Sequence, residues 1–313
     1  SCTQLAETYN ISHDSVNRFL EREDYTPHDL YQESIQHIDN NKLIVSIDDT
    51  VLDKPYSQHM DLVSYFWSGK HHRSVKGINL ITLYATDQNG QNIPINFRIY
   101  DKSEGKTKND YFMDMLSEVL SWGAKIQFIT GDSWYSSTGN LKTIRKYGIR
   151  FMFGIDCNRK VSPEKGQWFQ LRLLPDFHQG QVVWLKDFGF VQLFKTQLKE
   201  QQRFYIVHQD EDDLLSFEGF HELHSSHWKI EQYHRVIKQV CHIEKFQVRR
   251  SKLILNHIFS ALMAYVEIQK NQFERIFENI YRWQKKLFRP MIKNFIDDFI
   301  LDKNHLLPQR IYK

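Results

Sequence analysis

Two short apolar runs that each lead into an acidic residue limit what this chain can fold into. Leu43–Asp48 (LIVSID) is rich in β-branched residues and ends on an acid, which is typical of a buried strand. Ile126–Thr130 has the same character and is followed by Gly131-Asp132. Both runs therefore predict strands that deliver a carboxylate to their carboxyl ends.

The segments around these two runs alternate between strand and helix patterns. An Asn89-Gly90 pair between two of them is a strong hairpin signal. The resulting order, β-β-β-α-β-α-β, suggests an α/β fold with an RNase H-like mixed sheet and flanking helices. In that fold the first and fourth strands lie side by side, so Asp48 and Asp132 would share one edge of the sheet. The other expected strands are 78–86, 93–99 and 150–155, and the expected helices are 107–122 and 140–147.

The rest of the chain suggests an interrupted core with helical ends. Residues 3–22 have the size and spacing of a helix-turn-helix, with Ser15, Asn17 and Arg18 free to touch DNA, although a plain helical hairpin fits equally well. The first residues already look helical and the chain lacks an initial Met, so we expect sequence upstream. The expected divisions are a helical, helix-turn-helix-like segment at 1–40, the core at 41–155, a β-rich insertion at 156–220, the end of the core at 221–260, and a basic helical region at 261–313.

Charge is distributed unevenly along the 313 residues. From Gln232 to Lys313 there are 16 Lys and Arg against 7 Asp and Glu, whereas the preceding residues carry 25 against 31. A basic carboxyl-terminal part indicates contact with a polyanion such as DNA. A solvated basic helical surface is the alternative.

A third acid is expected on the helix predicted over His221–Val240. Spacings of three and four residues place one acid and several bases on a single helical face. Such a face can present one metal ligand and hold phosphates with its remaining side chains, although a solvated charged face is the alternative. The face consists of His224, His227, Glu231, Arg235 and Lys238.

Three carboxylates that converge from separate elements suit a site for two Mg²⁺ (or Mn²⁺) ions. Mg²⁺ prefers carboxylate oxygens, and a pair of ions can carry out phosphodiester chemistry. We expect Asp48, Asp132 and Glu231 to be the catalytic and metal-binding residues. Asp49 stays open as the alternative to Asp48, because adjacent strand residues face opposite sides. Each Asp could instead cap its own turn.

With these motifs the chain resembles the insertion-sequence DDE transposases, whose third acid lies in the signature Tyr-x2-Arg-x3-Glu-x6-Lys. Glu231 and Lys238 have the required six residues between them, but His224 and His227 stand where the signature has Tyr and Arg. The matching segments are Ile47-Asp48-Asp49-Thr50 with Lys54-Pro55, Gly131-Asp132-Ser133-Trp134-Tyr135, and Trp228-x-Ile230-Glu231 with Lys238.

The resemblance implies a transposase that cleaves and transfers DNA strands at the ends of an insertion sequence. It also implies a β-rich insertion between the second Asp and the Glu. The implied partners are double-stranded DNA, as terminal inverted repeats and as target, and further copies of the chain in a transposition complex. The implied location is the bacterial cytoplasm, in association with the nucleoid. The residues expected to bind DNA are His224, His227, Arg235, Lys238, Arg249, Arg250 and Trp134.

Two other readings stay open. His221, His224, His227, Glu231 and His234 could bind zinc, although the spacing lacks the His-Glu-x-x-His pattern. A decayed or repurposed transposase that only binds DNA is the second alternative.

No apolar run reaches the roughly 18 residues needed to span a bilayer, so no membrane partner is expected. The three cysteines are far apart and odd in number, which argues against a disulfide framework.

Overall fold

The structure is a computed structural model that describes residues 6–7, 9–69, 71–164, 166–198, 201–208, 213–286 and 293. The chain divides into two compact units, Ser1–Val266 and Glu267–Lys313. Most of the expected carboxyl-terminal helical region beyond residue 286 lies outside the described residues. None of the described helices is long and apolar enough to cross a membrane.

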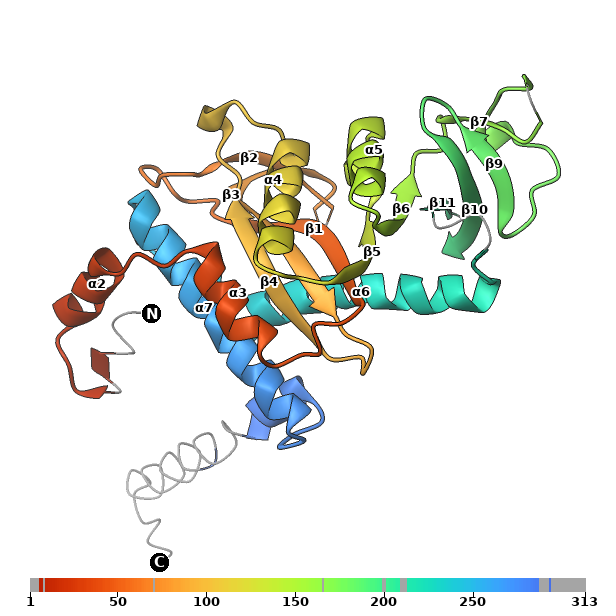
Figure 1. Ribbon diagram of the computed structural model, residues 1–313. Coiled ribbons are helices and arrows are strands. Elements are labelled where there is room, and N and C mark those ends of the chain that lie inside the picture. The colour runs from red at the N-terminus through yellow and green to blue at the C-terminus, as the bar shows by residue number, and fades with distance from the viewer. Residues whose placement is uncertain are drawn as a thin grey trace, which may run out of the picture. The chain divides into compact units, whose positions relative to one another are not determined.

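Eleven strands form one mixed sheet within the described residues, with helices against its faces (Figure 1). The strands follow the order β2-β3-β1-β5-β6-β11-β10-β9-β7-β8, with β4 also paired to β3. The strands are β1 Leu43–Asp53, β2 Ser64–Ser68, β3 Arg73–Thr86, β4 Asn92–Ile99, β5 Ile126–Gly131, β6 Arg150–Ile155, β7 Lys160–Ser162, β8 Phe169–Gln170, β9 Gln181–Leu185, β10 Gly189–Leu198 and β11 Gln201–His208.

The helices are distributed along the whole described chain. The α-helices are α2 His13–Arg22, α3 Pro27–Ile35, α4 Lys108–Ser121, α5 Thr138–Lys146, α6 Phe217–Gln239 and α7 Ser251–Phe273, and the short 3-10 helices are η1 Lys102–Glu104, η2 Ser133–Tyr135 and η3 Leu171–Leu173.

The expected α/β fold class is confirmed. β1 pairs antiparallel with β3 and parallel with β5, and β5 pairs parallel with β6, which is compatible with an RNase H-like core. The first and fourth strands of the predicted order therefore lie side by side. The apolar run of β1 that led to the strand prediction is buried, and Leu43, Val45 and Ile47 are all inaccessible to solvent. The short strand β2, with the aromatic sequence SYFWS, was not expected. The extension of β3 back to Arg73 was not expected either, since its sequence there is polar and basic.

The two faces of β1 are covered by different helices. Ser46 and Asp48 point to the face covered by α6, where Asp48 lies near His234. Asp49 points to the opposite face, where Lys108 begins α4. Alternation along the strand thus divides the two neighbouring acids between two sides of the sheet.

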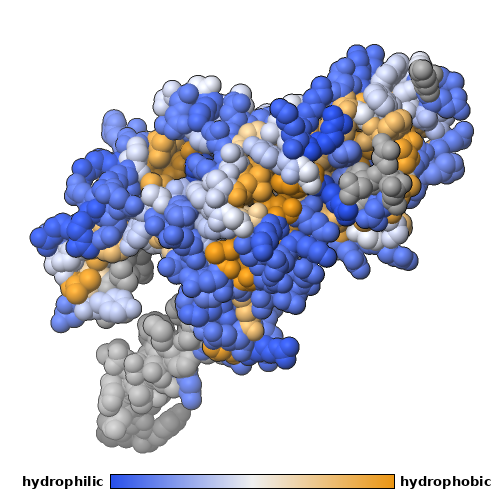
Figure 2. Space-filling view, in the orientation of Figure 1, coloured by the Kyte–Doolittle hydropathy of each residue, from blue (hydrophilic) through white to orange (hydrophobic). Residues whose placement is uncertain are grey.

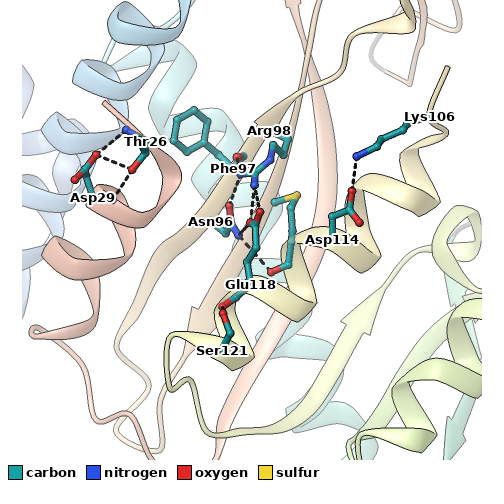
Figure 3. Close-up of polar contacts among 10 residues, drawn as sticks. Thr26, Asp29, Asn96, Phe97, Arg98, Lys106, Asp114, Glu118 and Ser121 are labelled. Carbon is teal, nitrogen blue, oxygen red and sulfur yellow. Dashed lines mark hydrogen bonds and ion pairs between the residues drawn. The ribbon is translucent and has the colours of Figure 1, made fainter. Parts of the chain in front are cut away.

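Polar contacts hold α4 on β4 (Figure 3). Arg98 of β4 makes an ion pair with Glu118 of α4, and the Asn96 side chain donates to the same carboxylate at 3.0 Å. The Met115 carbonyl also accepts from Asn96. These contacts, together with the buried face of α4, fix the position of Lys108 at the start of that helix.

Strands β9, β10 and β11 extend the sheet beyond β6 between the second Asp and the Glu. β11 pairs antiparallel with β6, and α6 follows it along the chain. An apolar cluster that includes Phe194, Tyr205 and Phe220 packs the beginning of α6 onto β10 and β11.

Hydrophilic residues cover most of the face seen in Figure 2, with hydrophobic ones gathered in separate patches.

The carboxyl end of β5 depends on a glycine. A Cβ added at Gly131 would lie 2.6 Å from Phe153 Cε1 and 2.7 Å from Ile47 Cγ2, both in neighbouring strands. Real Cβ atoms do not approach other atoms so closely, so any side chain here would push β1, β5 and β6 apart. Gly131 therefore allows the close contact that brings Asp132 to the edge of the sheet.

We expect Gly131→Ala to destabilise the protein by about 1–3 kcal/mol, because the added methyl overpacks a filled core. Gly139, in α5, is the matched control, since a Cβ there meets no atom within 4 Å. Gly139→Ala should be neutral or stabilise by up to about 1 kcal/mol through helix propensity. Urea denaturation of both variants measures the difference, and equal stabilities would contradict the close-packing argument.

Candidate active site

Neighbouring parallel strands bring Asp48 and Asp132 close together, since each follows a residue of the Ile47–Gly131 pair. Ser46 pairs with Thr130 in the register of β1 and β5, and their hydroxyl oxygens are 2.8 Å apart. Each Asp lies two residues beyond its hydroxyl partner, and Asp132 keeps an extended backbone with φ −77° and ψ −179°. Residues two apart in a strand face the same side, so Asp48 shares the α6 face with Ser46. Asp132 follows the last residue of β5, and its carboxylate is close enough to both Asp48 and Asp49 for their charges to interact.

Asp49 has a different environment on the opposite face. Its carboxylate accepts hydrogen bonds from Asn79 Nδ2 at 2.6 Å, Lys108 Nζ at 2.7 Å and the Tyr135 hydroxyl at 2.9 Å. Three donors occupy most of the acceptor capacity of a carboxylate, and one of them carries a full charge. Asp49 is therefore held as part of the scaffold, whereas Asp48 faces the helix that carries Glu231.

Glu231 of α6 and Asp48 of β1 line the same cleft, which has a volume of about 300 Å³. His234 and Lys238 of α6 also line this cleft, as do Asp49 of β1 and Trp67 of β2. Asp132 stands beside Asp48 but is not part of the cleft wall. The structure thus brings Asp48 and Glu231 into one cleft, with Asp132 at its margin.

The carboxylates of this group repel one another. Burial raises the pKa of Asp48 well above its usual range, and the charges of Asp132 and Asp49 raise it further. Burial, followed by the charge of Asp49, raises the pKa of Asp132 to about 6. Burial also raises the pKa of Glu231. A divalent cation would relieve this repulsion, and oxygen donors of this kind suit Mg²⁺ or Mn²⁺.

The two histidines at the Tyr and Arg positions of the signature point toward the sheet. His224 Nε2 lies 3.0 Å from the Tyr205 hydroxyl, and His227 Nδ1 lies 3.2 Å from Thr130 Oγ1. Burial lowers the pKa of both rings, that of His227 to about 4. At neutral pH they are therefore uncharged groups that pack α6 against β5 and β11.

The other expected DNA-binding residues on α6 differ in exposure. Arg235 is exposed to solvent. Lys238 is largely buried and donates to the Val51 carbonyl at 2.7 Å, with Glu244 Oε1 at 3.3 Å. In this structure the Lys238 ammonium already has partners in the loop that follows α6.

The basic residues before α7 also have distinct surroundings. Arg249 is exposed and lines a second hollow of about 500 Å³ with Lys54, Tyr56 and Phe246. Arg250, in contrast, makes an ion pair with Glu21 of α2 at 2.5 Å.

Trp134 directly follows the Asp132-Ser133 step. Its side chain is 62% exposed, and the Lys108 ammonium lies 5.6 Å from its ring centroid. It remains free to stack on another flat group.

The sequence did not single out Lys108, it suggested Tyr135 only as part of the motif around Asp132, and it suggested His234 only as a zinc ligand. Lys108 and Tyr135 are recruited to Asp49 by packing across the sheet, for which no local signal exists. His234 follows Glu231 by three residues, a spacing that places both on one helical face and could have identified it. Its Nδ1 lies 3.5 Å from Asp48 Oδ2. Burial lowers the pKa of His234 to about 3, so the ring is neutral.

No three of the described His, Cys, Asp and Glu side chains stand in an arrangement that could hold one metal ion as they are. This holds for the trio Asp48, Asp132 and Glu231 and for the histidines of the zinc reading alike. Ligation by the acidic trio therefore requires side-chain movement toward a common centre.

Removing one charge from the acidic group should stabilise the metal-free protein. We expect Asp48→Asn to raise the melting temperature at pH 8, where roughly 2–4 °C corresponds to about 1 kcal/mol. Because the pKa of Asp48 is raised in the folded protein, the wild type loses stability as pH rises from the ordinary carboxyl range through the folded pKa. The asparagine of the variant does not ionise, so the stability gain of Asp48→Asn over the wild type should vanish near pH 4. Thermal melts in EDTA from pH 4 to 8 measure it. A gain that is independent of pH would contradict the repulsion.

Comparisons with known proteins identify the family of the chain. A family profile described as "Transposase DDE domain" matches residues 39–266, which contain all three acids. No curated protein matches the chain. Among solved structures, Marinitoga piezophila Argonaute with a 5′ OH guide RNA is 11% identical, covers 60% of this chain and has a TM-score of 0.24. The same Argonaute with guide RNA and target DNA is 10% identical, covers 71% of this chain and also has a TM-score of 0.24. The chain spans only 26% and 29% of those Argonaute chains, and a likeness this low carries no argument. The family match covers most of the chain, which therefore belongs to the DDE transposases.

Proposed function

We propose that this chain catalyses metal-dependent strand cleavage and strand transfer at the ends of an insertion sequence. Asp48, Asp132 and Glu231 would hold two Mg²⁺ or Mn²⁺ ions. The observation that supports this most strongly is that Asp48 and Asp132 follow paired residues of two parallel strands, while Asp48 shares a cleft with Glu231 of α6. A phosphodiester could approach from this open cleft, and the three carboxylates would turn toward a common centre.

When bound, the two ions would neutralise charge on the phosphate and activate an oxygen nucleophile. The protein's own residues provide the geometry. Close packing of β1 and β5 sets the spacing of Asp48 and Asp132, and the three donors to Asp49 keep the end of β1 from shifting. Glu231 would complete the site by turning toward the two aspartates.

The partner would be double-stranded DNA, both as terminal inverted repeats and as target, with further copies of the chain in the transposition complex. Arg235, one turn beyond Glu231 on α6, and Arg249, at the second hollow, are exposed cations that suit phosphate contacts. Lys238 could exchange Glu244 for a phosphate, and the exposed ring of Trp134 could stack on an unpaired base. His224 and His227, which face the sheet, would support the helix and not the DNA.

A DNA-binding protein that has lost catalysis is the second candidate. The ion pair of Arg250 with Glu21 and that of Lys252 with Asp24 favour a stable, folded amino-terminal segment in either case. Only cleavage separates the two candidates, because both would bind DNA.

We expect Asp48→Asn, Asp132→Asn and Glu231→Gln each to reduce cleavage by at least about 100-fold, since losing a metal ligand removes several kcal/mol of charge stabilisation. Asp49→Asn is the matched control, because the Asp49 carboxylate is already bound by three protein donors although Asp49 lines the same cleft, and this change should reduce cleavage far less. The measurement is nicking of a plasmid that carries the inverted repeats flanking the gene, with Mg²⁺ or Mn²⁺. Wild-type protein that binds the DNA but cuts no better than the variants would favour the catalytically inactive candidate. A larger loss of cleavage in Asp49→Asn than in Asp48→Asn would mean that Asp49 is the metal ligand and Asp48 the supporting residue.

DNA affinity should fall steeply with salt if the basic carboxyl-terminal part contacts phosphates. Arg249→Ala should lower the slope of log K against log salt by about 1. Lys125→Ala is the control, since this exposed lysine precedes β5 at the end of the strand opposite Asp132. Fluorescence anisotropy with a plain duplex measures both slopes. A flat salt dependence, or equal effects of the two variants, would count against this surface.

A further inference from the structure

His234 lies at the centre of the candidate site, although no part of the family signature includes it. It is on α6, one turn beyond Glu231, and its side chain is only 10% exposed. Its Nδ1 lies 3.5 Å from Asp48 Oδ2, and the ring lines the same cleft as Asp48 and Glu231. A buried polar ring in contact with a proposed metal ligand requires a physical reason.

The other ring nitrogen of His234 distinguishes two possible roles. Nε2 is buried and has no hydrogen-bond partner within the part of the chain that the structure describes. If Nδ1 bound a metal, Nε2 would carry the proton, and a buried N–H without an acceptor is costly; metal-binding histidines almost always donate that proton to a partner. If Nδ1 carries the proton, Nε2 keeps only a lone pair, and the N–H points at a carboxylate.

The contacts of Asp48 lead to the same conclusion. Its Oδ1 accepts from the backbone N–H of Asp49 at 2.8 Å. Its Oδ2 lies 3.5 Å from His234 Nδ1, a nitrogen that carries a proton in one of the two neutral tautomers of the ring. A carboxylate held at one oxygen can still swing about its Cβ–Cγ bond, whereas contacts at both oxygens fix its plane. Hydrogen bonds of this kind are often long in free enzymes and shorten when the site is loaded.

We propose that His234 is a positioning residue that donates from Nδ1 to Asp48 and orients this carboxylate for metal binding. The proposal rests on the proposed function, since it takes Asp48 as a metal ligand. His234 itself stays outside the metal coordination. Its role is to set the direction in which Asp48 presents its free lone pairs to the ion.

The substitutions that test this follow from the shape of the ring. His234→Asn places an amide nitrogen close to where Nδ1 was, so it keeps the donor but removes the imidazole. His234→Gln places its nitrogen near the former Nε2, away from Asp48, and His234→Ala removes both. A purely structural role would tolerate Gln about as well as Asn, whereas a positioning role requires the donor at the Nδ1 place.

The experiment measures binding of Mn²⁺ alone to the full chain by electron paramagnetic resonance, with thermal melting as a check on folding. Loss of an outer partner to a metal ligand typically weakens metal binding about 10–100-fold. We expect that loss in His234→Ala and His234→Gln, binding within a few-fold of wild type in His234→Asn, and no nitrogen coupling to Mn²⁺ in the wild-type spectrum.

Each opposite result would overturn the inference. Equal Mn²⁺ affinity in His234→Ala and wild type would remove the positioning role. Weak binding by a folded His234→Asn variant, or a directly bound nitrogen in the spectrum, would make His234 a ligand instead. Asp48→Asn keeps the tests separate: if wild type binds Mn²⁺ and Asp48→Asn does not, the proposed site stands even when the His234 inference fails. If Asp48→Asn binds Mn²⁺ like wild type, the proposed site itself is wrong.

Discussion

The parallel pairing of β1 with β5 is the contact on which the candidate site depends. Ile47 pairs with Gly131, and the missing side chain of the glycine lets Ile47 and Phe153 pack against the strand from both sides. Asp48 and Asp132 each follow directly from this pair. A different register would move one carboxylate to the other face of the sheet, because side chains alternate with a period of two. The apolar packing of the core therefore decides where the charged residues lie.

This packing holds together charges that would otherwise separate. The raised pKa values of Asp48, Asp132 and Glu231 show that their surroundings disfavour the ionised forms. The buried, mutually repelling carboxylates thus lower the stability of the folded protein, and the apolar packing of the sheet offsets this cost. Asp49 differs because Lys108, Asn79 and Tyr135 satisfy its carboxylate. Asp49 is therefore suited to a supporting role, whereas the neighbouring Asp48 would gain from a bound cation.

Several cations that looked available for DNA are bound within the molecule. Arg250 pairs with Glu21, and the Asn256 side chain donates to the carbonyls of Leu20 and Glu23, both at 2.7 Å, so α2 is attached to the start of α7. Lys238 is likewise bound to the chain around its own cleft. The positive charge in the carboxyl-terminal part thus divides between cations that already have an acidic partner, such as Arg250 at the surface, and cations such as Arg249 that line an open hollow.

The sequence alone predicted the fold class, the main alternation of strands and helices, and the acids that follow the apolar runs of β1 and β5, because these depend on local periodicity. It also placed Glu231, Lys238 and the two histidines on one helical face. It did not predict β2, or that β1 continues past Asp48 to Asp53. Only the tertiary structure decided which of Asp48 and Asp49 faces α6, that His224 and His227 turn to β11 and β5, and that His234 meets Asp48. Those contacts join residues far apart in the chain. They depend on strand register and on the direction from which each helix packs, and neither is encoded in a local pattern.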